Sequence, residues 1–229
     1  MAPPGGPARL ARALLDLLLP PVCAGCRVAT GPEAPVLCRA CLARLPVRPA
    51  DDPPPPPPLR AVAAGAPLED GWAEWVHRFK YPAAGLRGLD PGAEAVAGAL
   101  VRRAARRAPG PPDAVLPMAL HPARVRARGL HPPALLARAV AREAGRPLRP
   151  GLLRRVRDTP SQTGLARDAR RRNVAGAFRA SGRCPPRVWL VDDVVTTGAT
   201  LAEAARTLRR AGAREVVGIC AARTPAPPG

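Results

Sequence analysis

The clearest periodic pattern lies between residues 187 and 212. The run from Arg187 to Val191 is short, apolar and β-branched, which is typical of a strand buried on both faces. Two carboxylates, Asp192 and Asp193, and a turn rich in Thr and Gly follow it. Apolar side chains then recur at helical spacing, and a glycine is placed to end the helix: Leu201, Ala204, Ala205, Leu208, Ala211 and Gly212. The pattern predicts a strand, a turn and a helix in succession.

A run of prolines divides the chain. Residues 46–60 include six consecutive prolines and can form neither a helix nor an interior strand. Such a run favours polyproline II and acts as a semi-rigid spacer. The 229 residues have room for one ordinary domain and a small module. We therefore expect an N-terminal helix and cysteine module, a linker, a larger domain and a tail, over residues 1–46, 47–60, 61–224 and 225–229.

The first residues carry a short apolar stretch, 13–19, behind Arg9 and Arg12. Asp16 interrupts this stretch and no small-residue cleavage site follows, so we interpret it as a short amphipathic helix and not as a signal peptide. The chain has no run of about 18 apolar residues, which excludes a membrane-spanning helix. These features favour a cytoplasmic protein.

Four of the six cysteines form two closely spaced pairs, Cys23 with Cys26 and Cys38 with Cys41. Two C-x2-C pairs at this separation can direct four thiolates at one tetrahedral Zn²⁺. The module holds too little apolar surface to fold alone, so a metal has a structural purpose there. Disulfides are the competing use of these cysteines and require an oxidising compartment. Four protein ligands leave no open position, which predicts a structural zinc without catalytic chemistry.

The net charge of +19 is concentrated in one part of the sequence. Between Arg124 and Arg183 there are 16 arginines and three acids, a set of arginines that we call the arginine belt. A localised excess of this kind favours polyanionic partners, either nucleic acid or phosphorylated small molecules. The competing explanation is a solvated surface that has drifted in composition, since Arg, Ala, Gly and Pro all have GC-rich codons.

The predicted strand, turn and helix carry candidate chemistry. Open α/β sheets bind ligands at the carboxyl ends of their strands. A helix that begins after small, hydroxyl-bearing residues offers N–H groups and a favourable dipole to a phosphate. Asp192 and Asp193 can accept hydrogen bonds from sugar hydroxyls or approach a Mg²⁺ ion. We expect both carboxylates to stay at a solvent-facing rim, because an unpaired carboxylate is costly to bury.

Residues 188–200 resemble the phosphoribosyl-pyrophosphate (PRPP) motif of type I phosphoribosyltransferases: four apolar residues, two acids, two apolar residues and Thr-Thr-Gly-x-Thr. The resemblance implies that Asp192 and Asp193 bind the ribose 2′- and 3′-hydroxyls and are the catalytic candidates. It implies that the following loop holds the 5′-phosphate, through Thr196, Thr197, Gly198, Ala199 and Thr200. PRPP would bind together with Mg²⁺ on its diphosphate.

Further motifs extend the resemblance to the ComF family of competence-associated, phosphoribosyltransferase-like proteins. They occur in order within residues 14–223: the cysteine pairs, Lys80-Tyr81, Val115-Leu116-Pro117, Arg124, Arg128-Gly129, Gln162, Leu165, Arg170, Asn173 and Phe178. The family has Arg-Gly-Phe-Asn-Gln where this chain has Arg128-Gly129-Leu130-His131-Pro132. This departure puts in doubt any family contact through that Asn or Gln, although Pro132 can open the next helix.

The family resemblance implies a zinc ribbon joined to an α/β domain, in which a mostly parallel sheet carries helices on both faces. By position, residues 113–117 form a second buried strand and 118–128 the loop at its end. In phosphoribosyltransferases such a loop holds pyrophosphate, so Arg124 and Arg128 are candidate ligands; general basic surface is the alternative. The segment 159–164 resembles the superfamily's mobile loop, with Gln162 as a candidate substrate contact.

The sequence shows no general base for an incoming nucleophile. His121 and His131 have no acid partner that the sequence reveals, and we expect both to be non-catalytic. His77 lies in a predicted helix, 72–81, whose aromatic residues we expect to pack in the core. This absence favours a binding protein over an enzyme, and the resemblance to the ComF family implies its role. We expect an accessory factor in DNA uptake that binds PRPP or a nucleotide and contacts single-stranded DNA and uptake proteins. The alternative is an active Mg²⁺-dependent phosphoribosyltransferase; neither its acceptor nor the oligomeric state follows from the sequence.

Overall fold

The computed structural model describes residues 22–23, 26–30, 37–44, 53–68, 75, 78–79, 91–160 and 167–225. Several predicted features lie outside these residues: the N-terminal helix, Lys80-Tyr81, His77, Gln162, Leu165 and residues 226–229 of the tail. Within the described part of the chain, no helix is both long and apolar enough to cross a membrane.

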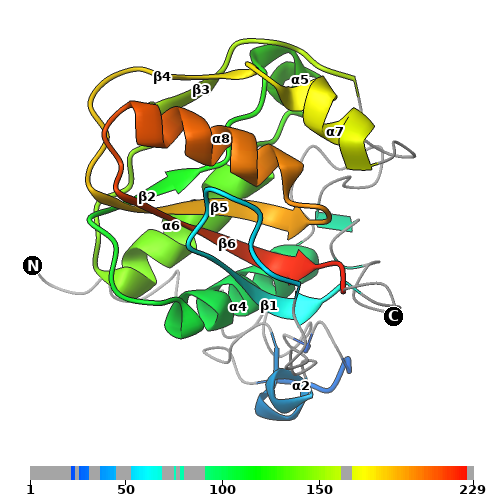
Figure 1. Cartoon of the computed structure of the whole chain (residues 1–229). Helices are drawn as coiled ribbons and strands as arrows, with labels where there is room; N and C mark the ends of the chain where they lie inside the picture. Colours follow the sequence, from blue (N-terminus) through cyan, green and yellow to red (C-terminus); the bar gives the residue numbers. More distant parts are fainter. Residues whose placement is uncertain are drawn as a thin grey trace, which may run out of the picture.

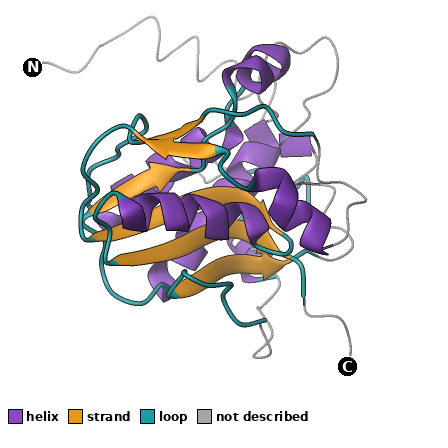
Figure 2. Ribbon diagram, turned by 45° about the horizontal axis from the view of Figure 1, so that its top comes forward, coloured by secondary structure: helices purple, strands orange, loops and turns teal. Residues whose placement is uncertain are grey.

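A four-stranded parallel sheet forms the centre of the fold, in the order β1-β6-β5-β2 (Figure 1). Its strands are β1 (Ala61–Pro67), β2 (Ala114–Pro117), β5 (Arg187–Val195) and β6 (Glu215–Arg223). The helices α4 (Pro91–Arg107) and α6 (Pro132–Ala144) cover one face, and α8 (Ala199–Arg210) covers the other (Figures 1 and 2). This arrangement confirms the predicted mostly parallel sheet with helices on both faces.

Smaller elements complete the α8 side of the molecule. An antiparallel ribbon of β3 (Leu153–Arg155) and β4 (Phe178–Ala180) lies over α8 (Figure 1). The helix α7 (Arg167–Val174) packs against α8. Among the described residues, two short helices remain: α5 (Pro122–Arg128) after β2, and α2 (Arg39–Ala43) in the cysteine module.

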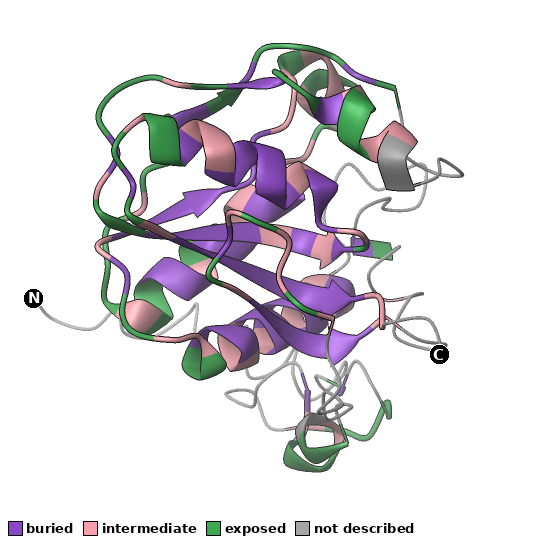
Figure 3. Cartoon of the chain, in the orientation of Figure 1, coloured by how far each residue is buried: buried purple, intermediate pink, exposed green. Residues whose placement is uncertain are grey.

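The buried strands serve two cores because successive side chains point to opposite faces of a sheet. Trp189 and Val191 join the hydrophobic cluster that includes α4 and α6, whereas Val188 and Leu190 join the cluster that includes α8. Figure 3 shows the sheet buried between its helical layers. This burial on both faces explains why the sequence reads as a continuous apolar run and not as an alternating one.

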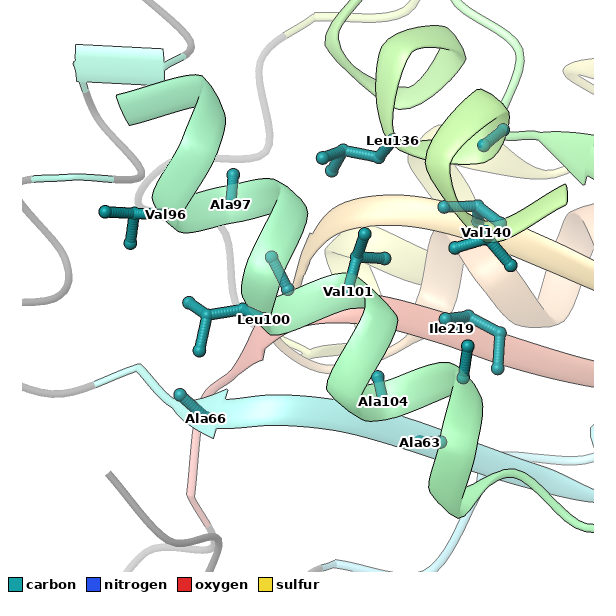
Figure 4. Close-up of a cluster of buried hydrophobic side chains, with 14 of the residues drawn as sticks. Ala63, Ala66, Val96, Ala97, Leu100, Val101, Ala104, Leu136, Val140 and Ile219 are labelled. Carbon is teal, nitrogen blue, oxygen red and sulfur yellow. The ribbon is translucent and has the colours of Figure 1, made fainter. Parts of the chain in front are cut away.

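Small residues allow α4 to lie very close to the sheet. A Cβ atom at Gly65 would lie 2.2 Å from the carbonyl oxygen of Leu100, so only glycine fits beneath the helix there. Leu100 and Val101 of α4 are fully buried, and Ala63 and Ala66 of β1 belong to the same cluster (Figure 4). The abundant alanine of this chain therefore supports close helix–sheet contact.

The structure corrects two predicted boundaries. The strand that was expected to stop at Val191 continues to Val195, because it stays paired with β6 as far as Arg223. The expected loop over 118–128 contains α5, which begins at a proline and ends before Gly129 in a left-handed conformation, with φ of 66°. The helix predicted after the departure from the family motif does begin at Pro132.

The described part of the proline run packs against the α8 side of the fold. Leu59 is 6% exposed and belongs to the α8 cluster. The Arg223 guanidinium donates to the Pro54 carbonyl at 3.3 Å, and the Arg206 guanidinium to the Pro57 carbonyl at 3.4 Å. We call residues 53–59 the proline strap.

Candidate functional site

The two predicted carboxylates lie inside β5, close to its carboxyl end. Asp192 is half-buried and Asp193 is only 7% exposed. An Asp192 carboxylate oxygen accepts a hydrogen bond from the Asp193 N–H at 2.9 Å, and an Asp193 oxygen accepts one from the Val194 N–H at 2.7 Å. The expected solvent-facing rim is therefore wrong for Asp193, because the strand continues past it and the backbone supplies a donor to the buried carboxylate.

The predicted phosphate loop links β5 to the N-terminus of α8. Gly198 is the N-cap of α8, with φ of 74°, a left-handed conformation that glycine adopts without strain. A glycine N-cap brings no side-chain acceptor to the first-turn N–H groups of the helix. Thr197 Oγ1 accepts from the Ala199 N–H at 3.4 Å. The loop therefore joins a helix N-terminus with hydroxyl groups, as a phosphate site requires.

An arginine from α7 reaches the same loop. Arg170 donates from Nη1 to Thr196 Oγ1 at 3.3 Å. Its Nε is buried and has no hydrogen-bond partner among the described residues. A buried guanidinium N–H beside a phosphate loop is the donor that an anion would satisfy.

A cavity of about 270 Å³ opens beside the loop. It is lined by the proline strap, the loop before α8, α7 and α8 itself, through Pro56, Pro57, Arg171, Thr197, Ala199, Ala202 and Arg206. The strap touches the loop directly, since a Cβ atom at Gly198 would lie 2.6 Å from Pro56 Cγ.

The predicted pyrophosphate ligand Arg124 is held by the segment after β3. Its Nε donates to Asp158 Oδ1 at 3.2 Å, and its Nη2 donates to the Thr159 carbonyl. Arg155 lies buried in β3, 7% exposed, and donates to Thr159 Oγ1 at 2.5 Å. The second predicted ligand, Arg128, ends α5, and its side chain lies outside the described structure.

Arg155 lies near the candidate site, which the sequence did not reveal. Burial lowers its pKa from the ordinary value and the neighbouring Arg124 acts in the same direction, whereas Asp158 and Asp192 oppose the shift. Asp192 is thus close enough to interact electrostatically with a buried cation from another element. The sequence signal was weak, because Arg155 is one of many arginines in the belt.

The structure gives both histidines the acid neighbours that the sequence could not show. Burial lowers the pKa of His131, while a hydrogen bond with the Met118 backbone and the nearby Asp193 carboxylate oppose that shift. His121 caps α5, accepting from the Ala123 N–H at 3.4 Å, and its Nδ1 lies 3.8 Å from Asp158 Oδ2. His131 therefore lies near the candidate site as a mainly neutral imidazole.

The four N-terminal cysteines converge as predicted. The sulfur atoms of Cys23, Cys26, Cys38 and Cys41 all lie within 4.8 Å of one another. The Cys26 and Cys38 sulfurs are 3.7 Å apart, close to the separation of about 3.8 Å for two ligands of one tetrahedral zinc ion with Zn–S bonds of about 2.3 Å.

The surroundings of this cluster fit a zinc ion. The Cys38 N–H donates to the Cys23 sulfur at 3.2 Å, and the Cys41 N–H donates to the Cys38 sulfur at 3.4 Å. A hydrogen bond with Cys23 is the main cause that raises the pKa of Cys41 to about 12. Four thiolates can share this small volume only when a cation compensates their charge, which is the chemistry of a structural zinc ribbon.

The comparisons with known proteins found curated relatives but no matching family model. Competence protein F of Haemophilus influenzae is 37% identical over 109 residues, which cover 46% of this chain and 48% of the relative. DNA utilization protein YhgH of Salmonella typhi is 38% identical over 125 residues, which cover 52% of this chain and 54% of the relative. The chain thus spans about half the length of the curated relatives it matches.

Parts of this chain also align with solved structures. The allosteric regulatory enzyme of purine biosynthesis aligns with a TM-score of 0.41 and 22% identity, over 63% of this chain and 30% of the other. The purine phosphoribosyltransferase of Pyrococcus horikoshii aligns with a TM-score of 0.29 and 22% identity, over 51% of this chain and 66% of the other.

Proposed function

We propose that this chain, a homologue of Competence protein F and DNA utilization protein YhgH over about half its length, binds PRPP or a nucleotide 5′-phosphate and serves DNA uptake as an accessory factor. The observation that carries the proposal is the meeting of three features at one loop: the β5 carboxylates, the glycine-capped N-terminus of α8, and Arg170. Carboxylates suit sugar hydroxyls, and the helix terminus and guanidinium suit a phosphate.

In this proposal, each part of the site has a chemical role. Asp192 and Asp193 accept hydrogen bonds from the ribose 2′- and 3′-hydroxyls. The loop Thr196 to Thr200, together with Arg170, holds the 5′-phosphate. Arg124 and Arg128 hold the pyrophosphate group of PRPP through bidentate contacts. Mg²⁺, when bound with PRPP, neutralises charge on the diphosphate.

The cysteine cluster has a structural role in this account. A zinc ion on Cys23, Cys26, Cys38 and Cys41 would hold the N-terminal module and leave no position for a substrate. Thiolate ligands persist in a reducing compartment, which supports a cytoplasmic protein. The curated relatives are named for competence and for DNA utilization, and the proposal takes uptake proteins as partners of this chain.

The second candidate function is phosphoribosyl transfer, and His131 is the observation that favours it. In that reaction an acceptor attacks C1′ of PRPP while the bond to pyrophosphate breaks. A mainly neutral imidazole beside Asp193 can accept the proton that the acceptor loses. Asp192 and Asp193 would hold the ribose, and Arg124 would stabilise the leaving pyrophosphate.

Calorimetry with ribose 5-phosphate, PRPP and a nucleoside 5′-monophosphate, each with and without Mg²⁺, tests the proposal. We expect saturable binding of at least one phosphorylated ribose at one site per chain. An assay of pyrophosphate release from PRPP across nucleobases and amines then separates the two functions. Binding without release supports the accessory factor, release with any acceptor supports the transferase, and no binding contradicts both.

A further inference from the structure

The outer face of the β3–β4 ribbon carries two arginines directly opposite each other. Arg154 pairs with Arg179 across the antiparallel strands, and both side chains are exposed. Cβ atoms of such cross-strand neighbours lie about 5 Å apart, and like charges in this position destabilise a sheet. The inner face of the ribbon is buried on the α8 cluster through Leu153 and Phe178, so the register is fixed and the arginines cannot exchange faces.

Other arginines of the belt have roles within the fold. Arg124 and Arg170 bind Asp158 and Thr196, and Arg157 donates to the carbonyls of Ala175 and Asn173. These contacts hold loops of the α8 side together. Arg157 therefore acts within the fold, and Arg124 and Arg170 belong to the phosphate and pyrophosphate sites proposed above.

Three further arginines of the belt lie in α6 or just after its C-terminal end. Arg138, Arg142 and Arg146 surround a hollow at the C-terminal end of α6, where the helix dipole stabilises cations and disfavours a bound anion. This helix lies on the face of the sheet opposite α8 (Figure 1). The arginine belt is therefore divided between two faces of the molecule.

No such compensation exists for the ribbon pair within the described structure. No carboxylate among the described residues forms an ion pair with Arg154 or Arg179, and the two charges repel each other. An anion between the two guanidiniums would turn this repulsion into attraction. Val156 follows on the same ribbon face and is 47% exposed, which adds an apolar contact beside the pair.

The ribbon is linked to the elements of the candidate site through Arg155 and α8. Its inner-face residue Arg155 interacts electrostatically with Asp192, and β4 packs on α8, the helix that begins at the phosphate loop. A backbone contact suits this surface, since the described ribbon presents no aromatic side chain on its outer face for base stacking.

We propose that Arg154 and Arg179 form a clasp for the phosphodiester backbone of single-stranded nucleic acid. This inference rests on the proposed DNA contact and assigns it to the outer face of the β3–β4 ribbon. The guanidiniums bind the phosphate oxygens bidentately, and Val156 contacts the sugar.

The test compares two double variants that lose the same charge. R154Q/R179Q removes the clasp, and R138Q/R142Q removes two arginines from α6 on the other face. Binding of a fluorescent single-stranded oligonucleotide is measured by anisotropy over a range of salt concentrations. We expect R154Q/R179Q to bind about tenfold more weakly at 0.1 M salt, with a salt slope smaller by about 1.4, and R138Q/R142Q to keep the wild-type slope.

Thermal unfolding and two further titrations complete the experiment. R154Q/R179Q should be at least as stable as the wild type, because it removes a like-charge pair. Three results would each overturn the clasp. They are an equal loss of DNA affinity in both variants, wild-type DNA affinity in R154Q/R179Q, and displacement of the oligonucleotide by polyglutamate of the same total charge. PRPP calorimetry on the same proteins reports the phosphate site separately, so failure of the clasp and failure of the proposed function give different results.

Discussion

At the scale of single residues, buried polar groups gather near the carboxyl edge of the sheet. Asp193, Glu203 and Arg223 are all less than 9% exposed there. Glu203 illustrates how such a group is stabilised: it accepts from the Gly176 N–H at 2.9 Å and from Arg206 at 2.8 Å. Buried charge is costly without such partners, and here a backbone N–H and an arginine compensate it.

The contact between Gly198 and the proline strap gives a prediction about stability. Gly198→Ala should destabilise the fold for two reasons, a φ of 74° and a Cβ atom 2.6 Å from Pro56 Cγ. The left-handed conformation alone costs an alanine about 1–2 kcal/mol. Urea unfolding measures the difference.

Two matched glycines separate these contributions. Gly176 has φ of 66° with no atom within 4 Å of its added Cβ, whereas Gly182 has neither a positive φ nor a contact closer than 4.0 Å. We expect Gly182→Ala to be about as stable as the wild type. Gly176→Ala should lose stability by the conformational cost alone, and Gly198→Ala should lose more stability than Gly176→Ala. If Gly198→Ala is no worse than Gly176→Ala, the strap does not press on the loop.

His131 predicts a dependence of stability on pH. Its pKa is lowered in the folded protein, so the unfolded chain binds the proton first as the pH falls through about 6.5. The wild type should therefore lose stability below that pH and retain it above. His131→Gln should lose less stability than the wild type between pH 7.5 and 5.5 in urea unfolding. His121→Gln is the control and should keep the wild-type dependence of stability on pH. If His131→Gln loses as much stability as the wild type between pH 7.5 and 5.5, the burial of this imidazole is contradicted.

At the scale of elements, the sequence predicts those helices and strands whose apolar residues follow a clear periodic pattern. The β5–α8 unit follows from its apolar run and helical spacing, although its strand proved longer because pairing with β6 continues through the carboxylates. The β3–β4 ribbon shows no alternation of apolar and polar residues from which it could be predicted, since each strand has only three residues and the outer positions are arginines. Arg155 and His131 could not be assigned to the site because only the tertiary fold brings them near Asp192 and Asp193.

The cysteine module gives a prediction at this scale. We expect one zinc ion per chain, lost in Cys38→Ser and kept in Cys184→Ser, whose sulfur is buried elsewhere in the fold. Cys23 and Leu37 share a hydrophobic cluster with α4, so loss of zinc should also lower the unfolding temperature of the whole fold. Metal analysis of freshly reduced protein and thermal unfolding are the measurements. A zinc-free wild type, or zinc retained in Cys38→Ser, would contradict the assignment.

At the scale of the whole molecule, the arginine belt is continuous in the sequence but is divided in the fold between the helical layers on the two faces of the sheet. Total charge follows from composition, but its division between the α6 face and the α8 face depends on chain topology. The phosphate loop, the proline strap and the β3–β4 ribbon lie on the α8 side, whereas Asp193 interacts with His131 at the start of α6. Both faces of the sheet carry a packed core, and the proposed phosphate loop lies on the α8 side.

The most direct test of this account is calorimetric titration of PRPP with Mg²⁺ into the wild type, Asp193→Asn and Asp113→Asn. Asp113 is the matched control, since it pairs with Arg187 at 2.7 Å where β5 begins, at the opposite edge of the sheet. We predict one site per chain in the wild type and in Asp113→Asn. Hydrogen bonds to a charged group contribute about 1.5–3 kcal/mol each, so Asp193→Asn should bind at least about tenfold more weakly. A wild type that binds no PRPP, or an Asp193→Asn variant that binds as tightly as the wild type, would contradict the assignment of this site.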